Sequence, residues 1–411
     1  MSDTDTQAVR VARGSAWEVF ALFLRLGLSS FGGPIAHLGY FRDEFVRRRG
    51  WLDDASFAQL LSVCQFLPGP ASSQMGFAIG LFRAGWRGAL AAFVGFTSPS
   101  ALLMFGFAVY APRAFGHPAG LAWLHGLKLV AVVIVTHGLW GMARTLTPDL
   151  RRLCIAAGAC ALVLTAGSAW WQLLAILAGG AIGLWLCRPA AVHDAAAFSI
   201  PYGRRLAIVC MALFLLGLAA ALALPRAAPS LAGLAAAFYQ SGSLVFGGGH
   251  VVLPLLQDQL VAPGWLGADA FLAGYGAAQA VPGPMFSLAA YLGTSVDLGV
   301  TPVLAATVAL LCIFLPGFLL LIAALPLWTL LVRRPWAARA VAGINAAVVG
   351  VLAAALYDPV WREGVKSLAD AAIVALGLVL VTVLKRSAIW AVLWCVGAAV
   401  GWRLLQGFIG L

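Results

Sequence analysis

Apolar runs, separated by short polar or cationic turns, fill the chain from residue 16 to its carboxyl end. Uncharged runs of about 20 residues are typical of transmembrane helices. Two further stretches, 16–48 and 55–82, are broken by glycine and proline into arms of about 14 residues or fewer, which are too short to cross the hydrocarbon. These two stretches predict re-entrant hairpins. The uninterrupted runs predict full spans at 88–110, 119–146, 153–167, 170–187, 204–224, 340–357, 367–384 and 388–406.

The tips of both hairpins recur later in the chain. Phe31-Gly32-Gly33-Pro34 returns 215 residues on as Phe246-Gly247-Gly248-Gly249, and Leu67-Pro68-Gly69-Pro70 returns 214 residues on as Val281-Pro282-Gly283-Pro284. Such self-similarity indicates a duplicated unit. The second copy has Gly249-His250 where the first has Pro34-Ile35, so the two half-sites are not strictly equivalent.

Positive charge changes sides between the two copies. The cationic turn Arg47–Arg49 corresponds to Val261–Pro263, which is uncharged, in the second copy. By the positive-inside rule the two copies have opposite orientations in the membrane. Inverted repeats with broken helices are typical of secondary transporters. The predicted parts are a cytosolic tail at 1–15, a first transporter repeat at 16–188, a joint with one crossing helix at 189–229, and a second, inverted repeat at 230–411.

Composition separates this chain from the water-soluble classes. It is 62% hydrophobic and only 10% charged, so the lipid bilayer is its expected surrounding. The net charge of +11 lies in arginine-rich turns beside apolar spans, which indicates topology and not a nucleic-acid partner. The apolar spans contain no His-Glu-x-x-His and no aspartate pair at helical spacing, so we expect no metal, no cofactor and no catalytic residues. Glycine- and alanine-rich spans are compatible with a homodimer but locate no interface.

The four tips carry the candidate chemistry. A helix that begins at a tip offers unpaired backbone N–H groups and a partial positive charge, so converging helix starts can bind an anion. Serine and glutamine side chains near the tips can donate further hydrogen bonds to an oxyanion, although serine also caps ordinary helices. The predicted substrate-binding residues are Gly32, Gly33, Pro34, Gln65, Pro68, Gly69, Pro70, Ser72, Ser73, Gly247, Gly248, Gly249, His250, Gln279, Pro282, Gly283, Pro284 and Ser287.

Four charged residues stand apart because charge at membrane depth is costly and usually functional. Arg25 lies about two helical turns before the first tip, and Lys128 lies inside an apolar run. Each either supplies positive charge to an anion or extends to the membrane interface. Asp43 and Asp258 occupy the same position in the two copies, and they either carry protons, pair with Arg42 or another cation, or are ordinary polar residues of a surface helix.

The stretch FGGPIAHLGYFRDEFVRRRGWLDDASFAQLLSVCQFLPGPASSQMGFAIG and its repeat FGGGHVVLPLLQDQLVAPGWLGADAFLAGYGAAQAVPGPMFSLAAYLG resemble the chromate ion transporter family. The resemblance covers both halves and fits the long-chain, two-domain form. It implies a multi-pass protein of the bacterial or archaeal inner membrane that exports chromate by secondary active transport and confers chromate resistance. Because chromate and sulfate are near-isosteric dianions, a sulfate or general oxyanion transporter is the alternative. An intramembrane enzyme is a remote alternative.

Overall fold

The computed structural model describes residues 14–31, 33–114, 118–166, 169–187, 200–224, 228–246, 249–328 and 334–409. Throughout these ranges the regular elements are helices, and six of them are long and apolar enough to cross a membrane. The chain is therefore an all-α polytopic membrane protein, as the sequence predicts. The six candidate spans are 71–110, 120–146, 204–223, 302–327, 335–364 and 388–406.

The first half of the chain forms helices α1 to α7. Three predicted spans are not among the six candidate spans: 170–187 and 367–384 lie in shorter apolar helices, α7 and α17, and 153–167 lies in α6, which has 17 residues. The bounds are α1 Ala16–Ser29, α2 Gly33–Phe41 (continued by a π-helix, Arg42–Arg48), α3 Asp54–Phe66, α4 Ala71–Ala114, α5 Pro118–Leu146, α6 Leu150–Ala166 and α7 Ala169–Leu186.

The second half follows the crossing helix α8 and repeats the same order. Short 3-10 turns replace the starts of two of its helices, at Gly249–Val251 and Met285–Ser287. The bounds are α8 Arg204–Ala223, α9 Leu231–Leu244, α10 Val252–Leu260, α11 Ala268–Ala278, α12 Leu288–Ser295, α13 Pro302–Ala324, α15 Pro335–Ala355, α16 Arg362–Gly364, α17 Leu368–Leu378 and α18 Ala388–Ile409.

The helices break where glycine and proline predict a break. Helix α1 ends at Ser29, and α2 begins at Gly33, whose φ of +77° favours glycine. Helix α3 ends at Phe66, and α4 begins at Ala71, directly after Pro70. The chain is therefore interrupted at both predicted tips of the first half.

The start of α3 is fixed by a side-chain cap. The Asp53 carboxylate accepts a hydrogen bond from the Ser56 backbone N–H at 2.7 Å. This bond satisfies a free donor of the first helical turn and lowers the pKa of Asp53 below its usual range.

Helix α4 folds back on itself near its start. Ala84 and Gly85 leave the helical conformation, and Gly85 has a φ of +63°. The two arms touch because Gly80 lies against the Gly88 carbonyl, where a β-carbon would not fit. The span within α4 is consequently its second arm, and the first arm leads from the Pro-Gly-Pro tip to the turn.

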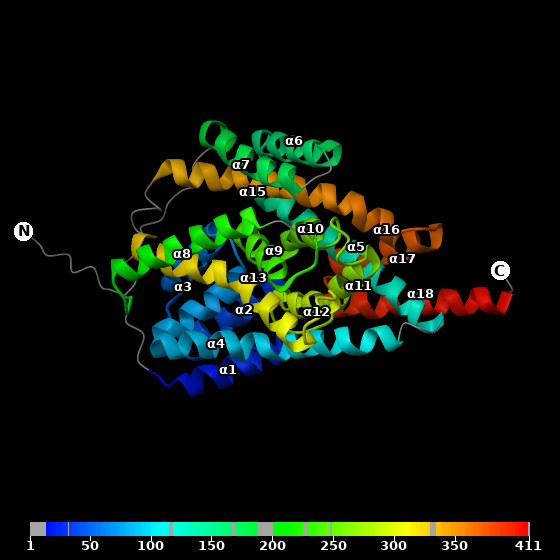
Figure 1. Cartoon of the computed structure of the whole chain (residues 1–411), viewed down its shortest axis with the longest axis horizontal. Coiled ribbons are helices and arrows are strands. Elements are labelled where there is room, and N and C mark those ends of the chain that lie inside the picture. The colour runs from blue at the N-terminus through cyan, green and yellow to red at the C-terminus, as the bar shows by residue number, and fades with distance from the viewer. Residues whose placement is uncertain are drawn as a thin grey trace, which may run out of the picture.

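Equivalent helices of the two halves run in opposite directions along the long axis of the molecule. The second arm of α4 runs from left to right in Figure 1, while α13 runs from right to left. Helices α5 and α15 are opposed in the same way.

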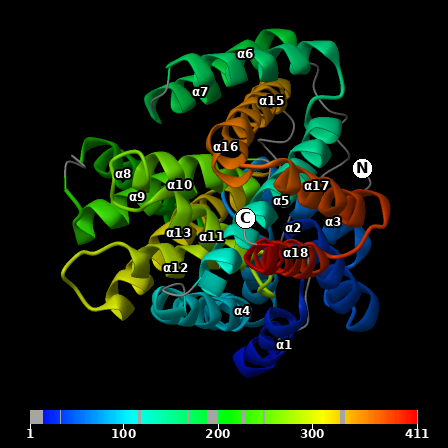
Figure 2. The same cartoon turned by 90° about the vertical axis from the view of Figure 1, so that its right-hand side faces the viewer.

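The terminal helices of each half pack on the other half. Gly126 of α5 lies against Val396 of α18, and the corresponding Gly343 of α15 lies against Gly179 of α7. Seen from the end, α18 lies beside α5, whereas α6 and α7 cover α15 (Figure 2). The halves therefore share helices across one continuous apolar core.

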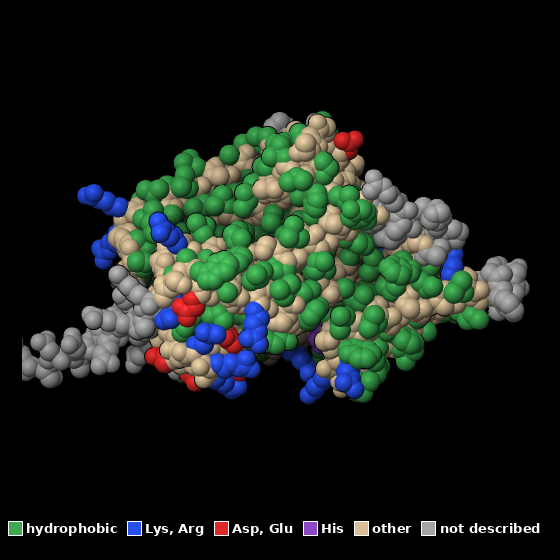
Figure 3. Space-filling view, turned by 90° about the horizontal axis from the view of Figure 1, so that it is seen from below, with side chains coloured by type: hydrophobic (Ala, Val, Ile, Leu, Met, Phe, Trp, Pro, Cys, Tyr) green, Lys and Arg blue, Asp and Glu red, His purple; other side chains and the backbone are tan. Residues whose placement is uncertain are grey.

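The outer surface suits a bilayer. Apolar side chains cover most of the face shown in Figure 3, and most of the charged side chains on this face lie toward its left end. The first turns of α1, α8 and α15 lie at this end in Figure 1. One end of the helix bundle is therefore richer in charge than its middle.

Candidate functional site

Each Pro-Gly-Pro tip is hydrogen-bonded to the glycine-rich tip of the other half. The Gly69 backbone N–H donates to the Val245 carbonyl at 2.7 Å, and the Gly283 N–H donates to the Ser30 carbonyl at 2.9 Å. Gly69 and Gly283 have φ values of +122° and +98°, a conformation that favours glycine. The four predicted tips are therefore brought together in two crossings, which we call the Gly69 crossing and the Gly283 crossing.

A long helix lies against each crossing. A β-carbon on Gly69 would lie 3.0 Å from the Gly317 Cα of α13, and a β-carbon on Gly283 would lie 3.0 Å from the Ser100 Oγ of α4. Ser100 follows Pro99, and Gly317 follows Pro316, so the two helices present equivalent positions to the tips.

At the Gly69 crossing the side chain of Gln74 holds the tip to α13. Its Nε2 donates to the Pro68 carbonyl at 3.0 Å and to the Gly317 carbonyl at 2.9 Å. Gln74 is fully buried, and its Oε1 has no partner among the described residues, nor does the Oγ of Ser73. The amide N–H groups of Gln74 are thus already engaged by protein carbonyls.

At the Gly283 crossing several polar side chains gather. The Nε2 of His37 lies 3.2 Å from the Ser30 carbonyl, the same oxygen that accepts from Gly283. The Ser100 hydroxyl donates to the Thr97 carbonyl at 3.0 Å. Three buried atoms, Ser30 Oγ, His37 Nδ1 and Thr97 Oγ1, have no hydrogen-bond partner within the described part of the chain.

Sequence reasoning missed Ser30, His37 and Thr97. Each is an isolated polar residue in an apolar helix or at its end, where packing is the ordinary explanation. The only available signal is their proximity in sequence to the Gly-Gly break and to Pro99. The proximity of Thr97 to the second-half tip cannot be read from sequence spacing.

The predicted glutamines and His250 lie in different surroundings. The Gln65 side chain is exposed at the end of α3. Gln279 is half-buried, and its Nε2 contacts the Met285 sulfur at 3.2 Å. The half-buried His250 ring lies against Gly138 of α5, with its Nδ1 2.8 Å from the Tyr275 hydroxyl. These three side chains are therefore not joined to one another.

The remaining predicted residues lie at the tips themselves. Three of them, Gly32, Gly247 and Gly248, fall outside the described residues. Gly33 and Pro34 are in the first turn of α2, and Gly249 begins a 3-10 turn. The buried residues of this group are Pro70, Ser72, Ser73, Pro282, Pro284 and Ser287, and Pro68 is half-buried.

The four charged candidates are separated in the structure. Arg25 is exposed on α1, and Asp43 is exposed and paired with Arg47 at 2.7 Å. Asp258 has a buried Oδ2 without a partner in the described chain. None of these three contacts a crossing through a hydrogen bond recorded for the described residues.

Lys128 forms an ion pair between the two halves. Its Nζ, on α5, lies 2.7 Å from the Asp269 Oδ1 in the first turn of α11. The Lys128 side chain is 10% exposed and the Asp269 side chain is 59% exposed. Asp269 was not a sequence candidate, because its counterpart in the first half is Ala55.

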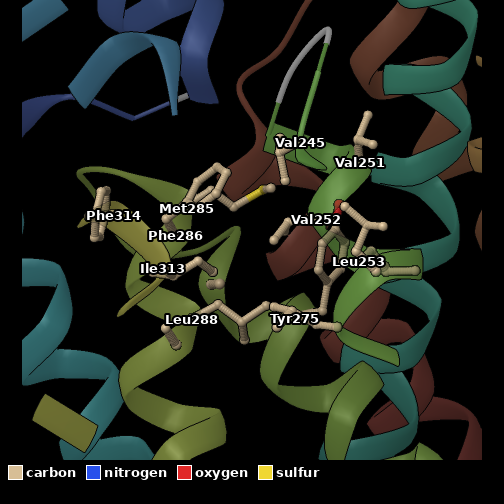
Figure 4. Packing of buried hydrophobic residues seen from close by; sticks show 14 of the residues in the cluster. Val245, Val251, Val252, Leu253, Tyr275, Met285, Phe286, Leu288, Ile313 and Phe314 are labelled. Carbon is tan, nitrogen blue, oxygen red and sulfur yellow. The ribbon is translucent and has the colours of Figure 1, made fainter. Parts of the chain in front are cut away.

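Apolar residues pack closely around the second-half tips. Val245 and Val252 lie on either side of the glycine-rich tip, Met285 and Phe286 follow the Pro-Gly-Pro tip, and Phe314 comes from α13 (Figure 4). All five are buried. Apolar packing therefore fixes the chain on either side of the second-half tips.

Comparison with known proteins identifies similar chains. A family model described as chromate transporter matches residues 17–184 and 232–402. A chromate transport protein of Pseudomonas aeruginosa is 28% identical over 369 residues, covering 87% of this chain and 84% of its own. A probable chromate transport protein of Synechococcus elongatus is 27% identical over 364 residues, covering 87% of both chains. No solved structure matches the chain.

Proposed function

This chain belongs to the chromate transporter family, and we propose that it exports chromate across the inner membrane by secondary active transport. Chromate transport is the activity named for the relatives in Pseudomonas and Synechococcus. Export of chromate from the cytoplasm would confer resistance to it. The remaining argument concerns how the tips bind and move the ion.

The observation that carries the proposal is the reciprocal crossing of the tips. Both Gly69 and Gly283 direct a backbone N–H across the boundary between the halves, where a carbonyl accepts it. A bound oxyanion would replace a carbonyl of this kind as the acceptor, because anionic oxygens are stronger acceptors than neutral carbonyls. Binding would thereby loosen the contact between the halves, which is the step that alternating access requires.

Neutral donors suit this cargo. Several N–H and O–H groups can stabilise a tetrahedral dianion without a permanently charged side chain. Such a side chain would also slow the release of the ion. Arg25 is exposed and Lys128 is neutralised by Asp269, so we assign neither to the binding site. Broken backbone at membrane depth is tolerated where it lines a ligand path or is buried in protein.

The proposed orientation puts the charge-rich end of the bundle in the cytosol. The first turn of α8 carries Arg204 and Arg205, Arg334 directly precedes α15, and Arg83 lies at the turn of α4. The positive-inside rule then makes the two halves inverted repeats, at 16–188 and 230–411. With the cell interior negative, outward movement of a dianion is favoured by about 2.3 kcal/mol per charge per 100 mV.

Chromate uptake into everted inner-membrane vesicles tests this function. Cytosolic sites face outward in such vesicles, so an exporter fills them. We expect chromate accumulation in energised vesicles that contain the protein and none in vesicles from the empty host. Absence of uptake in vesicles shown to be tight and energised would overturn the proposal of export.

Sulfate competition in the same assay defines the substrate class. Weak inhibition by excess sulfate would establish a carrier that discriminates between the two dianions. Complete inhibition at equimolar sulfate would instead identify a general oxyanion carrier, the alternative raised by the similar shape of the two ions.

A further inference from the structure

The two crossings are equivalent in backbone geometry but differ in the side chains that line them. Ser30, His37, Thr97 and Ser100 surround the Gly283 crossing. The repeat places Val245, Val252, Phe314 and Gly317 at the corresponding positions of the Gly69 crossing. A hydroxyl or imidazole is thus replaced by an apolar group at every one of these positions.

The Gly69 crossing is closed by apolar packing. Val245, Val252 and Phe314 are each no more than 1% exposed, and Figure 4 shows them among the packed apolar side chains. The Gln74 amide adds two hydrogen bonds to carbonyls of this crossing. Two buried atoms near this crossing, Ser73 Oγ and Gln74 Oε1, also lack partners in the described chain, but Oε1 is an acceptor and would repel an anion. An anion entering here would have to displace the two Gln74 bonds and would meet methyl and phenyl groups.

The Gly283 crossing has polar groups that the protein leaves unsatisfied. Ser30 and His37 are 0% exposed and Thr97 is 2% exposed, yet Ser30 Oγ, His37 Nδ1 and Thr97 Oγ1 lack hydrogen-bond partners in the described chain. Buried polar groups without partners are costly and uncommon in native proteins. The Ser30 and Thr97 hydroxyls can donate to a ligand with acceptor oxygens, whereas His37 Nδ1 is an acceptor because Nε2 carries the proton. The two hydroxyls without partners therefore point to a ligand that accepts hydrogen bonds, such as an oxyanion.

We propose that the Gly283 crossing is the oxyanion-binding crossing, with the Ser30 and Thr97 hydroxyls as donors to the ion, and that the Gly69 crossing is a packing contact. The proposal rests on the function proposed above. The Gly283 N–H is the third donor, and it becomes available when it leaves the Ser30 carbonyl. His37 acts as a positioning residue, because its Nε2–H holds that same carbonyl.

The difference in lining between the two crossings explains how a protein built from two repeats can have a single ion-binding site. If both crossings were polar, the transporter would have two competing sites. With one apolar crossing, the halves keep a fixed contact at Gly69 and open at Gly283. The bound oxyanion then contacts the glycine-rich tip of the first half and the Pro-Gly-Pro tip of the second.

Conservative variants test the two hydroxyls. Ser30→Ala and Thr97→Val each remove one donor, and we expect each to raise the KM for chromate uptake about tenfold or more, as loss of a hydrogen bond to a charged group predicts. Thr97→Ser retains the hydroxyl and should keep the wild-type KM within about twofold. Thr136→Val is the matched control, because within the described part of the chain the Thr136 hydroxyl bonds to the Val132 carbonyl of its own helix.

A binding measurement separates this inference from the proposed function. Chromate added to the purified wild-type protein in detergent should raise its Tm, and Ser30→Ala and Thr97→Val should lose most of that rise while Thr136→Val keeps it. Equal KM values and equal Tm rises in all variants would overturn the assignment of the Gly283 crossing, even if wild-type export is intact. Loss of the Tm rise in Ser30→Ala and Thr97→Val would support it even if vesicles showed no export.

Discussion

Replacing Asp269 with asparagine would leave a nearly buried ammonium group without its counter-ion. Lys128 and Asp269 join the two halves of the protein, since one is on α5 and the other begins α11. The corresponding position to Lys128 in the second half is Asn345, so the fold already accommodates an amide there. This supplies a natural double variant, Lys128→Asn with Asp269→Asn.

The expected magnitude follows from the geometry of the pair. Two unit charges about 4 Å apart attract by roughly 1 kcal/mol in water and roughly 4 kcal/mol in a protein-like medium. The Nζ–Oδ1 distance is 2.7 Å, but the Asp269 side chain is 59% exposed and therefore screened. We expect a coupling of about 2 kcal/mol, which is roughly a 30-fold change in the folding equilibrium.

Thermal unfolding of the purified variants measures this coupling. Asp269→Asn alone should lower the Tm by several degrees, because Lys128 would be left buried and unpaired. The double variant should recover most of that loss. Vesicle uptake by the double variant should remain near wild type, because in our interpretation the ion pair holds helices together and does not bind chromate.

Two results would refute this reasoning. If the Tm losses of the single variants simply add in the double variant, the two side chains are not coupled. If the double variant is as stable as wild type but transports no chromate, Lys128 supplies charge to the anion, and the ion pair is a resting-state contact of the binding site.

Three further predictions concern the tips, a helix contact and the topology. Gly69→Ala and Gly283→Ala should abolish uptake while leaving the protein in the membrane, because the backbone there would be strained and the β-carbon would lie 3.0 Å from its neighbours. Gly299→Ala is the control for backbone strain alone, because Gly299 has a φ of +65° and open space around it. Chromate uptake by both tip variants would contradict the crossing geometry. Gly343→Leu should separate α15 from α7 and lower the Tm by several degrees, since overpacking costs about 1–3 kcal/mol; an unchanged Tm would mean that the helices do not touch. In a cysteine-free variant, Arg48→Cys should react with an impermeant thiol reagent only from the cytosolic side of the membrane. Ala262→Cys should react only from the outer side. Labelling of both cysteines from the same side would exclude inverted halves.

The positions of the helix breaks could be predicted because they depend on local chemistry. Proline lacks a backbone donor, and glycine permits positive φ, so the Gly-Gly and Pro-Gly-Pro motifs mark the ends of α1 and α3 from sequence alone. Five of the six candidate spans overlap a span predicted from length and hydropathy, whereas the sequence analysis predicts none at 302–327. The predicted span 204–224 is α8, Arg204–Ala223, and 119–146 is α5, Pro118–Leu146.

The partners of the tips could not be predicted, because no local pattern relates them. Gly69 bonds to Val245 and Gly283 to Ser30, and each pair is formed only when the two halves pack together. The same is true of Lys128, for which sequence offered anion binding or extension to the interface. Its actual partner, Asp269, belongs to a helix that reaches α5 only through the tertiary fold.

The crossing of the tips also sets an order for biosynthesis. The Gly69 N–H has no acceptor until Val245 has been synthesised, about 180 residues later, which takes roughly 10–35 s at 5–20 residues per second. During that interval the first half lies in the membrane with the Gly69 N–H unpaired, because lipid chains offer no hydrogen-bond acceptor. The nascent first half is therefore the stage at which quality-control proteases would degrade this protein, and a premature stop before Val245 should yield a fragment that is degraded.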